Sequence, residues 1–172
     1  PTDAIYADTG RRTARTYYAR RNKIAEEDSD LVNWDALERA MKYWAVLYRV
    51  FYTKHMTGCC GVKHFENIIT RGATSAACPC CPDPDETTLH VLLCENETRK
   101  KLYFESIVKF EKWLRKTKTD PNLISMLVQY LKGRGEVTMV SCLSRRASKL
   151  NMFQQLAEEQ DRLGFQNLSE GR

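Results

Sequence analysis

Apolar side chains recur every three or four positions over most of the chain, a period that predicts a mainly helical fold. The first long segment begins near Asn33, a favourable helix cap, with Asp35 in its first turn. It should end near His55, because Gly58 follows shortly afterwards. We expect the apolar stripe of this helix to lie in the core, and the stripe comprises Trp34, Leu37, Met41, Trp44, Ala45, Tyr48 and Phe51.

Four further helices are predicted after residue 85. A short one over residues 86–94 has Asp85 as its cap, and a longer one covers residues 98–116. A third starts at the sequence Thr119-Asp120-Pro121, where a capping residue precedes proline, and ends at Gly133. The last helix covers about residues 144–163 and ends at Gly164. The side chains expected to face inward are Leu102, Ile107, Phe110, Leu114, Ile124, Leu127, Val128, Leu131, Leu150, Phe153, Leu156 and Leu163.

Two internal stretches lack a clear helical period. Glycine and proline punctuate residues 56–85, which predicts a loop, and residues 136–143 fit either a strand or the start of a helix. Residues 1–30 carry a basic run and then an acidic run, which predicts a linker or an arm. We expect a helical domain over residues 31–164 with a loop-rich zinc knuckle inserted at 78–94, then a tail over residues 165–172 that continues into a longer parent chain.

Composition narrows the class of protein. The chain has 172 residues, 42% of them apolar and 28% charged, which fits one globular domain. Its net charge of +5 permits an acidic partner such as nucleic acid without requiring one. The longest apolar stretch, residues 43–52, contains Arg49 and is too short to span a bilayer. Because no signal peptide is visible either, we expect an intracellular protein, nuclear or cytoplasmic, that does not bind membranes.

The cysteines carry the strongest chemical signal. Five of the seven fall between residues 59 and 81, and in a reducing compartment clustered cysteines bind metals more often than they form disulfides. Cys78 and Cys81 are separated by two residues, so that a tight turn can direct both sulfurs to one ion. His90 and Cys94 lie four apart, which places them on one face of a helix. One nitrogen and three sulfurs form the ligand set of a structural Zn²⁺ site, with no open position for a catalytic water.

The remaining cysteines leave alternatives. Cys80 competes with Cys81 for the second ligand position, although its one-residue gap to Cys78 is the poorer geometry. Cys59 and Cys60 could be a structural pair, fallback ligands or buried thiols, and we favour buried thiols. Cys142 is expected to be a core residue. Because the sequence shows neither a phosphate-binding glycine loop nor a serine nucleophile motif, we expect a protein that is not an enzyme; a nuclease would need carboxylates converging in one cleft.

Basic residues follow the cysteine segment on the predicted helix over residues 98–116. Four lysines can project from one side of this helix, while glutamates interleave with them. The surface is therefore either a solvated face with helical ion pairs or a set of phosphate contacts beside the zinc knuckle. The candidate nucleic-acid-binding residues are Lys100 and the one-sided set Lys101, Lys109, Lys112 and Lys116.

The segment from Cys78 to Cys94 resembles the zinc-binding region found downstream of the polymerase in many reverse-transcriptase polyproteins of retrotransposons. That pattern is a pair of cysteines with a two-residue gap, an acidic–threonine stretch (here residues 85–88), a histidine and a final cysteine. The resemblance implies a zinc-binding module. This sequence shows no polymerase or ribonuclease H carboxylate motif, so enzyme activity does not carry over. The resemblance covers roughly residues 34–172. Residues 54–62 resemble the segment that precedes the zinc-binding region in such elements. Residues 159–164 and 170–172 are similar to sequences in retroelement-derived open reading frames of algae and related protists.

Two functions follow as expectations. The first is a non-catalytic zinc-binding module of a retroelement-type polyprotein that assists binding of RNA or DNA. The alternative is a structural or protein-interaction domain. In this domain zinc only stabilises the fold, and the helices dock on the rest of the parent polypeptide. An exposed apolar groove without a continuous basic surface would favour the second function. The oligomeric state does not follow from the sequence.

Overall fold

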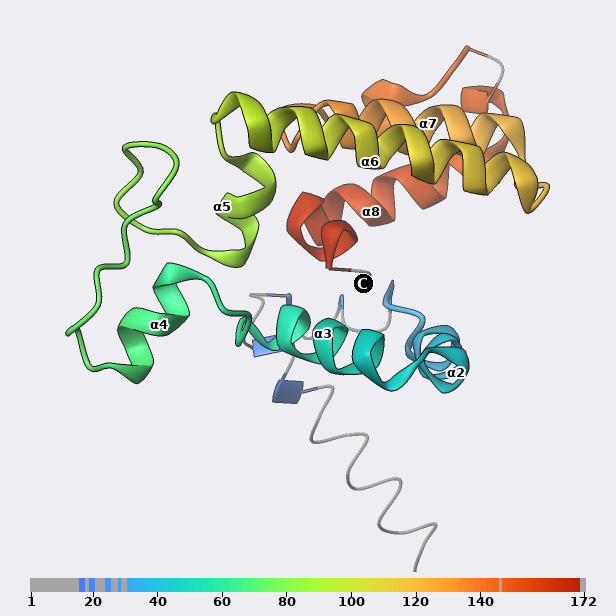
Figure 1. Cartoon of the computed structure of the whole chain (residues 1–172). Helices are drawn as coiled ribbons and strands as arrows, with labels where there is room; N and C mark the ends of the chain where they lie inside the picture. Colours follow the sequence, from blue (N-terminus) through green and yellow to red (C-terminus); the bar gives the residue numbers. More distant parts are fainter. Residues whose placement is uncertain are drawn as a thin grey trace, which may run out of the picture.

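The structure is a computed structural model that describes residues 16, 17, 19, 20, 24, 25, 28, 31–145 and 147–170 (Figure 1). The predicted arm over residues 1–30 therefore lies largely outside the described residues, as do the last two residues of the predicted tail. The described part is mainly helical, as the sequence predicts, and it contains no strand. None of its helices is long and apolar enough to cross a bilayer. The helices are α2 (Trp34–Tyr43), α3 (Val46–Thr57), α4 (Lys63–Ile69), α5 (Thr88–Leu93), α6 (Glu97–Lys116), α7 (Pro121–Lys132), the short 3₁₀ helices η2 (Val140–Cys142) and η3 (Ala147–Lys149), and α8 (Asn151–Ser169).

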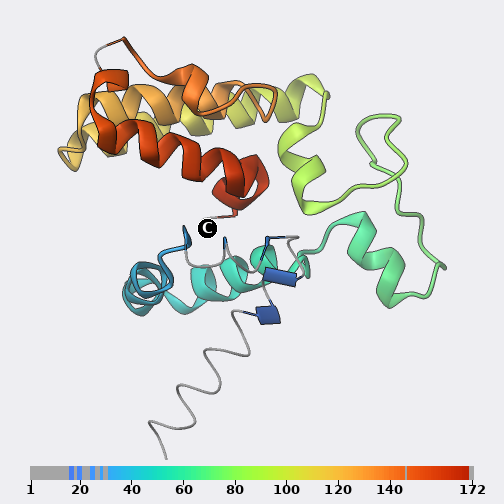
Figure 2. The same cartoon turned by 180° about the vertical axis from the view of Figure 1, so that it is seen from behind.

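Helices α6, α7 and α8 form the packed part of the molecule. Figure 1 shows α6 and α7 side by side. Figure 2, the view from the opposite side, shows α8 running along the same bundle. The apolar faces of α6 and α7 meet in one cluster of buried side chains, namely Ile107, Leu114, Ile124 and Val128. A second cluster joins α7 and α8 through the segment between them, and it contains Met126, Tyr130, Met139, Cys142, Ala157 and Phe165.

The start and end of α7 confirm the sequence prediction. The Asp120 carboxylate accepts hydrogen bonds from the amides of Asn122 and Leu123 at 2.7 and 3.4 Å, so it satisfies two amides that have no partner within the helix. Pro121 occupies the first turn, where its missing amide hydrogen costs nothing, and the helix ends at Gly133.

The ambiguous segment after α7 is held by a side chain from a distant helix. The Asp161 carboxylate of α8 accepts hydrogen bonds from the amides of Met139 and Val140 at 2.5 and 3.0 Å. It thereby caps η2, and the segment forms this short 3₁₀ turn in place of a strand. Farther along, the helical backbone breaks at Gly164 (φ 80°, ψ 167°), where the sequence predicts the helix to end, and a further helical stretch follows as part of α8. Phe165 at the start of this stretch packs into the core against Tyr130.

The prediction for the first helix is wrong in two respects. The segment forms two helices, because the backbone at Trp44 is extended (φ −83°, ψ 145°). The aromatic stripe also stays largely outside the core. Trp34 packs against a small cluster of Ala19, Ile24 and Val32, but Tyr48 and Phe51 are 66% and 61% exposed. Because the break at Trp44 divides the stripe between two helices, its side chains no longer share one face, and Met56 is the one buried side chain of α3. Leu102 and Phe110 on α6, Leu150 just before α8 and Leu156 on α8 are also expected to face inward and are exposed.

The predicted loop over residues 56–85 contains a helix, α4, that is capped from far along the chain. The Glu86 carboxylate accepts a hydrogen bond from the Lys63 amide at 3.0 Å, and the Glu86 carbonyl accepts one from the His64 amide at 3.2 Å. Because this cap comes from 23 residues away, no local sequence pattern predicts the start of α4. Helix α5 begins at Thr88, and its cap is Thr87 instead of the expected Asp85.

Candidate metal centre

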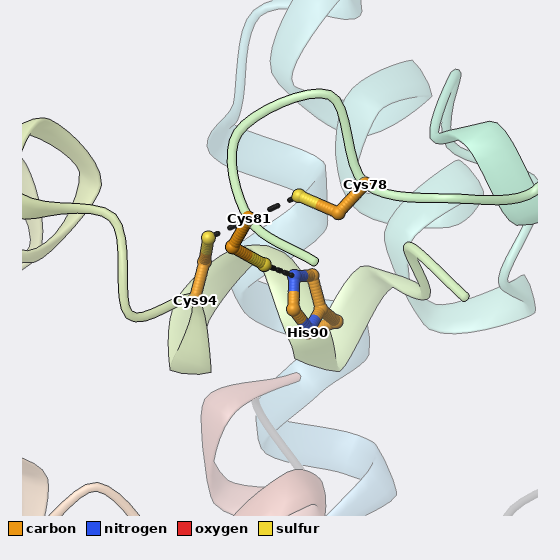
Figure 3. Close-up of side chains that lie close together, drawn as sticks. All are labelled: Cys78, Cys81, His90 and Cys94. Carbon is orange, nitrogen blue, oxygen red and sulfur yellow. Dashed lines mark hydrogen bonds between the residues drawn. The ribbon is translucent and has the colours of Figure 1, made fainter. Parts of the chain in front are cut away.

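Four side chains from the segment between α4 and α6 converge on one point. Cys78 and Cys81 lie on the loop before α5, His90 lies on α5, and Cys94 lies at the end of that helix. One nitrogen or sulfur atom from each of the four lies within 4.8 Å of all the others, and Figure 3 shows these atoms facing one another. In the described ranges this is the one group of three or more histidine, cysteine and acidic side chains that could hold a metal ion. The expected proximity of the four residues is therefore confirmed.

The separations within the cluster are compatible with ligands of one metal ion. The Sγ atoms of Cys78 and Cys94 are 3.9 Å apart, and Cys81 Sγ lies 3.3 Å from His90 Nε2 (Figure 3, dashed lines). With bonds of about 2.3 Å to sulfur and about 2.0 Å to nitrogen, the ligand atoms of a tetrahedral zinc site are about 3.5–3.8 Å apart. All seven cysteines are free thiols, so no disulfide competes for these sulfurs.

The backbone of the loop directs Cys80 away from the cluster. The Cys80 amide donates a hydrogen bond to Cys78 Sγ at 3.4 Å, and the Cys78 amide donates to the Asp83 carbonyl at 3.0 Å, which closes a tight turn. In this turn the side chain of Cys80 is exposed and does not belong to the group of four, whereas Cys81 does. Cys80 therefore contributes its backbone amide to the site, and its thiol lies outside.

Asp83 orients the histidine. Its carboxylate lies 3.2 Å from His90 Nδ1, which leaves Nε2 as the ring nitrogen that faces Cys81. A carboxylate on the far nitrogen fixes the tautomer and the ring orientation of a metal-binding histidine. The sequence shows Asp83 in an acidic stretch without indicating this role, because its spacing to His90 becomes meaningful only once the loop is folded.

A partly buried ion pair supports the cluster from the side of α6. Arg99 donates from Nη2 to the Glu86 carboxylate at 2.6 Å and from Nη1 to Cys78 Sγ at 3.6 Å. Glu86 is only 5% exposed, and its hydrogen bond raises the pKa of Arg99 further above its usual range. Three thiolates and a divalent cation carry a net charge of −1, so a guanidinium beside Cys78 compensates the charge of a filled site. The sequence analysis assigned Arg99 only to the basic run and missed this role.

The thiols of the cluster influence one another's ionisation. Burial raises the pKa of Cys78, but hydrogen bonds from the Cys80 amide and His90 together outweigh it, and the pKa lies below its usual range. The pKa of Cys94 is also lowered, because the Asn96 amide and Cys81 offset the effect of burial. The Asp83 amide lowers the pKa of Cys81, yet burial and the neighbouring thiols raise it overall to about 11. A divalent cation would allow all three to ionise together.

Arg134 connects the cluster to the helical bundle. Its Nη2 donates to the Cys94 carbonyl at 3.0 Å, and its Nη1 lies 3.1 Å from Glu95 Oε1. The guanidinium also lies over the ring of Tyr103 on α6, at 5.7 Å from the centroid. Because Arg134 follows α7 and lies over Tyr103 of α6, it connects Cys94 to two helices of the bundle.

The basic candidates on α6 fall into two groups. Lys100 is paired with Glu95 at 2.6 Å, and Arg115 on the same helix is paired with Glu111 at 2.7 Å. The other candidates are exposed along the helix, as predicted for a solvated or phosphate-binding surface, and they are Lys101, Lys109, Lys112 and Lys116.

The other cysteines stand apart from the cluster. Cys142 is buried in the core between α7 and α8, as expected. Cys59 and Cys60 are half-buried, so the preference for buried thiols holds only in part, and burial raises the pKa of Cys60.

No family model, curated protein or solved structure matches this chain.

Proposed function

We propose that this chain is a zinc-binding helical module of a retroelement-type polyprotein that assists the binding of nucleic acid. Cys78, Cys81, His90 and Cys94 would hold the ion, and the zinc would have a structural role. The convergence of these four ligand atoms within 4.8 Å is the observation that carries the proposal.

The donor set favours zinc over other common cations. Thiolate sulfur is a soft ligand that Mg²⁺ and Ca²⁺ disfavour, and three sulfurs with one imidazole nitrogen are a familiar zinc shell. Four protein ligands complete a tetrahedron, so no position remains for a water that could act as a nucleophile. The role that fits such a shell is to order the long loop against α4, α5 and α6.

The lysines of α6 support the nucleic-acid part of the proposal. Lys101, Lys109, Lys112 and Lys116 are exposed, and their positions fall within one side of the helix. This side lies opposite the buried residues Ile107 and Leu114, so a phosphate backbone can reach it without disturbing the core. Binding through lysines alone predicts strong dependence on salt and weak dependence on sequence.

The test is titration of the zinc-loaded chain with short RNA and DNA at increasing salt. The Lys112→Glu/Lys116→Glu double variant should bind at least about tenfold more weakly at low salt and give a flatter plot of log affinity against log salt. Lys132→Glu, on the exposed surface of α7, is a control that changes charge elsewhere. Nucleic-acid binding that is undetectable at low salt would contradict the proposal.

The exposed apolar surface of α3 favours a second candidate, a domain that docks on the rest of a longer parent polypeptide. Val46, Leu47 and Phe51 are all exposed and would be covered in such an assembly. The test is calorimetric titration with the neighbouring polypeptide of the parent gene, comparing Phe51→Ser with the unaltered chain. A loss of affinity in the variant supports docking through α3, and unchanged affinity rejects it.

A further inference from the structure

Helix α6 exposes a pair of stacked aromatic rings. The rings of Phe110 and Trp113 are nearly parallel, with an angle of 17° between their planes and 5.9 Å between their centroids. Trp113 is 56% exposed and Phe110 is 36% exposed. The indole is therefore available to a partner while Phe110 supports it, although neither ring is needed to fill the core between α6 and α7.

Two lysines neighbour the exposed indole on the helix surface. Lys109 and Lys116 lie four residues before and three residues after Trp113, the spacings at which side chains on a helix become neighbours. Lys112 precedes Trp113 and is exposed as well. Glu111 lies in the same half of the helix but is paired with Arg115 at 2.7 Å, and Glu105 lies farther toward the N-terminus, so the three lysines dominate the surface around the aromatic pair.

We propose that this part of α6 is a platform for single-stranded nucleic acid, in which a base stacks on Trp113 while Lys109, Lys112 and Lys116 contact the flanking phosphates. The inference rests on the proposed function and specifies the class of nucleic acid that the module binds. An aromatic face next to three cations is the combination that single-strand-binding proteins use, since every base has a π-face and every linkage carries a charge.

The arrangement distinguishes single strands from duplexes. In a duplex the faces of the bases are covered by their neighbours, and a side chain reaches only their edges or the phosphates. A side chain that offers a flat ring gains contact only with an unstacked base. The lysines can bind either form, so the exposed Trp113 is the element that favours the single strand.

The charge around the rings also distinguishes this surface from an ordinary apolar docking site. A protein partner would have to be acidic to match Lys109, Lys112 and Lys116, whereas a nucleic acid supplies the negative charge along its whole length. One nucleic-acid strand can therefore contact the Trp113 ring through a base and the lysines through its phosphates. This charge complementarity is the reason to prefer a nucleic acid as the occupant.

The experiment measures the affinity of the full zinc-loaded chain for a 12-nucleotide oligo-dT, an oligo-U of the same length and a mixed-sequence DNA duplex, at low salt. The variants are Trp113→Ala, Trp113→Phe and, as a matched control that removes an exposed aromatic ring from α3, Tyr48→Ala. Trp113→Ala should weaken single-strand binding about tenfold and change duplex binding less than about twofold. Trp113→Phe should retain most of the affinity, and Tyr48→Ala should have no effect.

The outcomes separate this inference from the proposed function. If Trp113→Ala leaves single-strand binding unchanged while the lysine variant weakens it, the platform is overturned and the proposed function stands; an acidic protein partner would then be the occupant to seek. If no nucleic acid binds, both fail. If Trp113→Ala lowers the melting temperature of the chain, its loss of binding could come from unfolding, and Trp113→Phe is the deciding variant. A Trp113→Phe chain that melts like the unaltered chain but does not bind single strands would also overturn the platform. The oligo-dT and oligo-U arms show whether DNA or RNA is preferred.

Discussion

Helix α3 and the pair α6–α7 carry similar apolar patterns but differ in what covers them. Leu114 on α6 is 6% exposed because α7 packs against it, whereas Leu47 on α3 is 77% exposed. Both leucines lie in sequences with aromatic and aliphatic residues at helical spacing. The difference teaches that a periodic pattern determines which side chains share a face, while burial depends on a second element with a matching face.

The segment from α4 to α5 is a third kind of structure, in which polar contacts replace a large apolar core. It contains the cluster of three thiols and an imidazole, the Glu86–Arg99 ion pair and the link from Arg134 to Cys94. Structure that is organised around a metal ion should respond to metal removal much more strongly than the bundle does.

Metal removal should therefore have the largest effect. Chelation of the proposed zinc should lower the stability of the chain by about 3 kcal/mol or more, the contribution of a ligand present at a hundred times its Kd. For a chain of this size that corresponds to a fall of roughly 6–12 °C in the melting temperature. Scanning fluorimetry with and without chelator, followed by re-addition of zinc, measures it, and an identical melting curve would contradict the expectation.

Truncation of matched leucines should have the next largest effect. Leu114→Ala should cost about 2–4 kcal/mol because it leaves a cavity between α6 and α7. Leu47→Ala should stay within about 0.5 kcal/mol, because its side chain loses few contacts. Urea unfolding of both variants gives the two values. Equal destabilisation would show that α3 is covered in solution and would remove the difference between the two regions.

Removal of the helix caps should have the smallest effect. Asp120 caps α7 and Asn33 caps α2, where its side chain accepts from the Ala36 amide at 2.9 Å. Asp120→Ala should lower global stability by about 1 kcal/mol, because α7 belongs to the bundle. Asn33→Ala should leave global stability unchanged and speed hydrogen exchange only within α2, a helix without fully buried residues. The idea fails if both caps contribute equally to global unfolding.

The parts of the structure that the sequence predicts well depend on short-range signals. All four cluster residues fall within seventeen positions, so their spacing alone indicates a shared centre. The ends of α7 are equally local, since Asp120, Pro121 and Gly133 each act on their own helix. Such signals remain visible without knowledge of the tertiary fold.

The parts that the sequence misses depend on distant partners or on small backbone preferences. Arg134 reaches the Cys94 carbonyl from 40 residues away, and Glu86 caps α4 from 23 residues away. Neither relation leaves a local pattern. The break at Trp44 has no proline or glycine to mark it, and the stripe continues through it with a helical period. Periodicity therefore predicted one buried helix where the structure has two largely exposed ones.

Metal analysis of two neighbouring cysteine variants tests the metal centre most directly. The purified chain should contain about one zinc per molecule, Cys80→Ser should retain it, and Cys81→Ser should lose most of it or bind it far more weakly. The two substitutions are identical in chemistry and adjacent in sequence, but only Cys81 Sγ belongs to the cluster. A metal-free unaltered chain, or loss of zinc from Cys80→Ser with retention in Cys81→Ser, would contradict the proposed site.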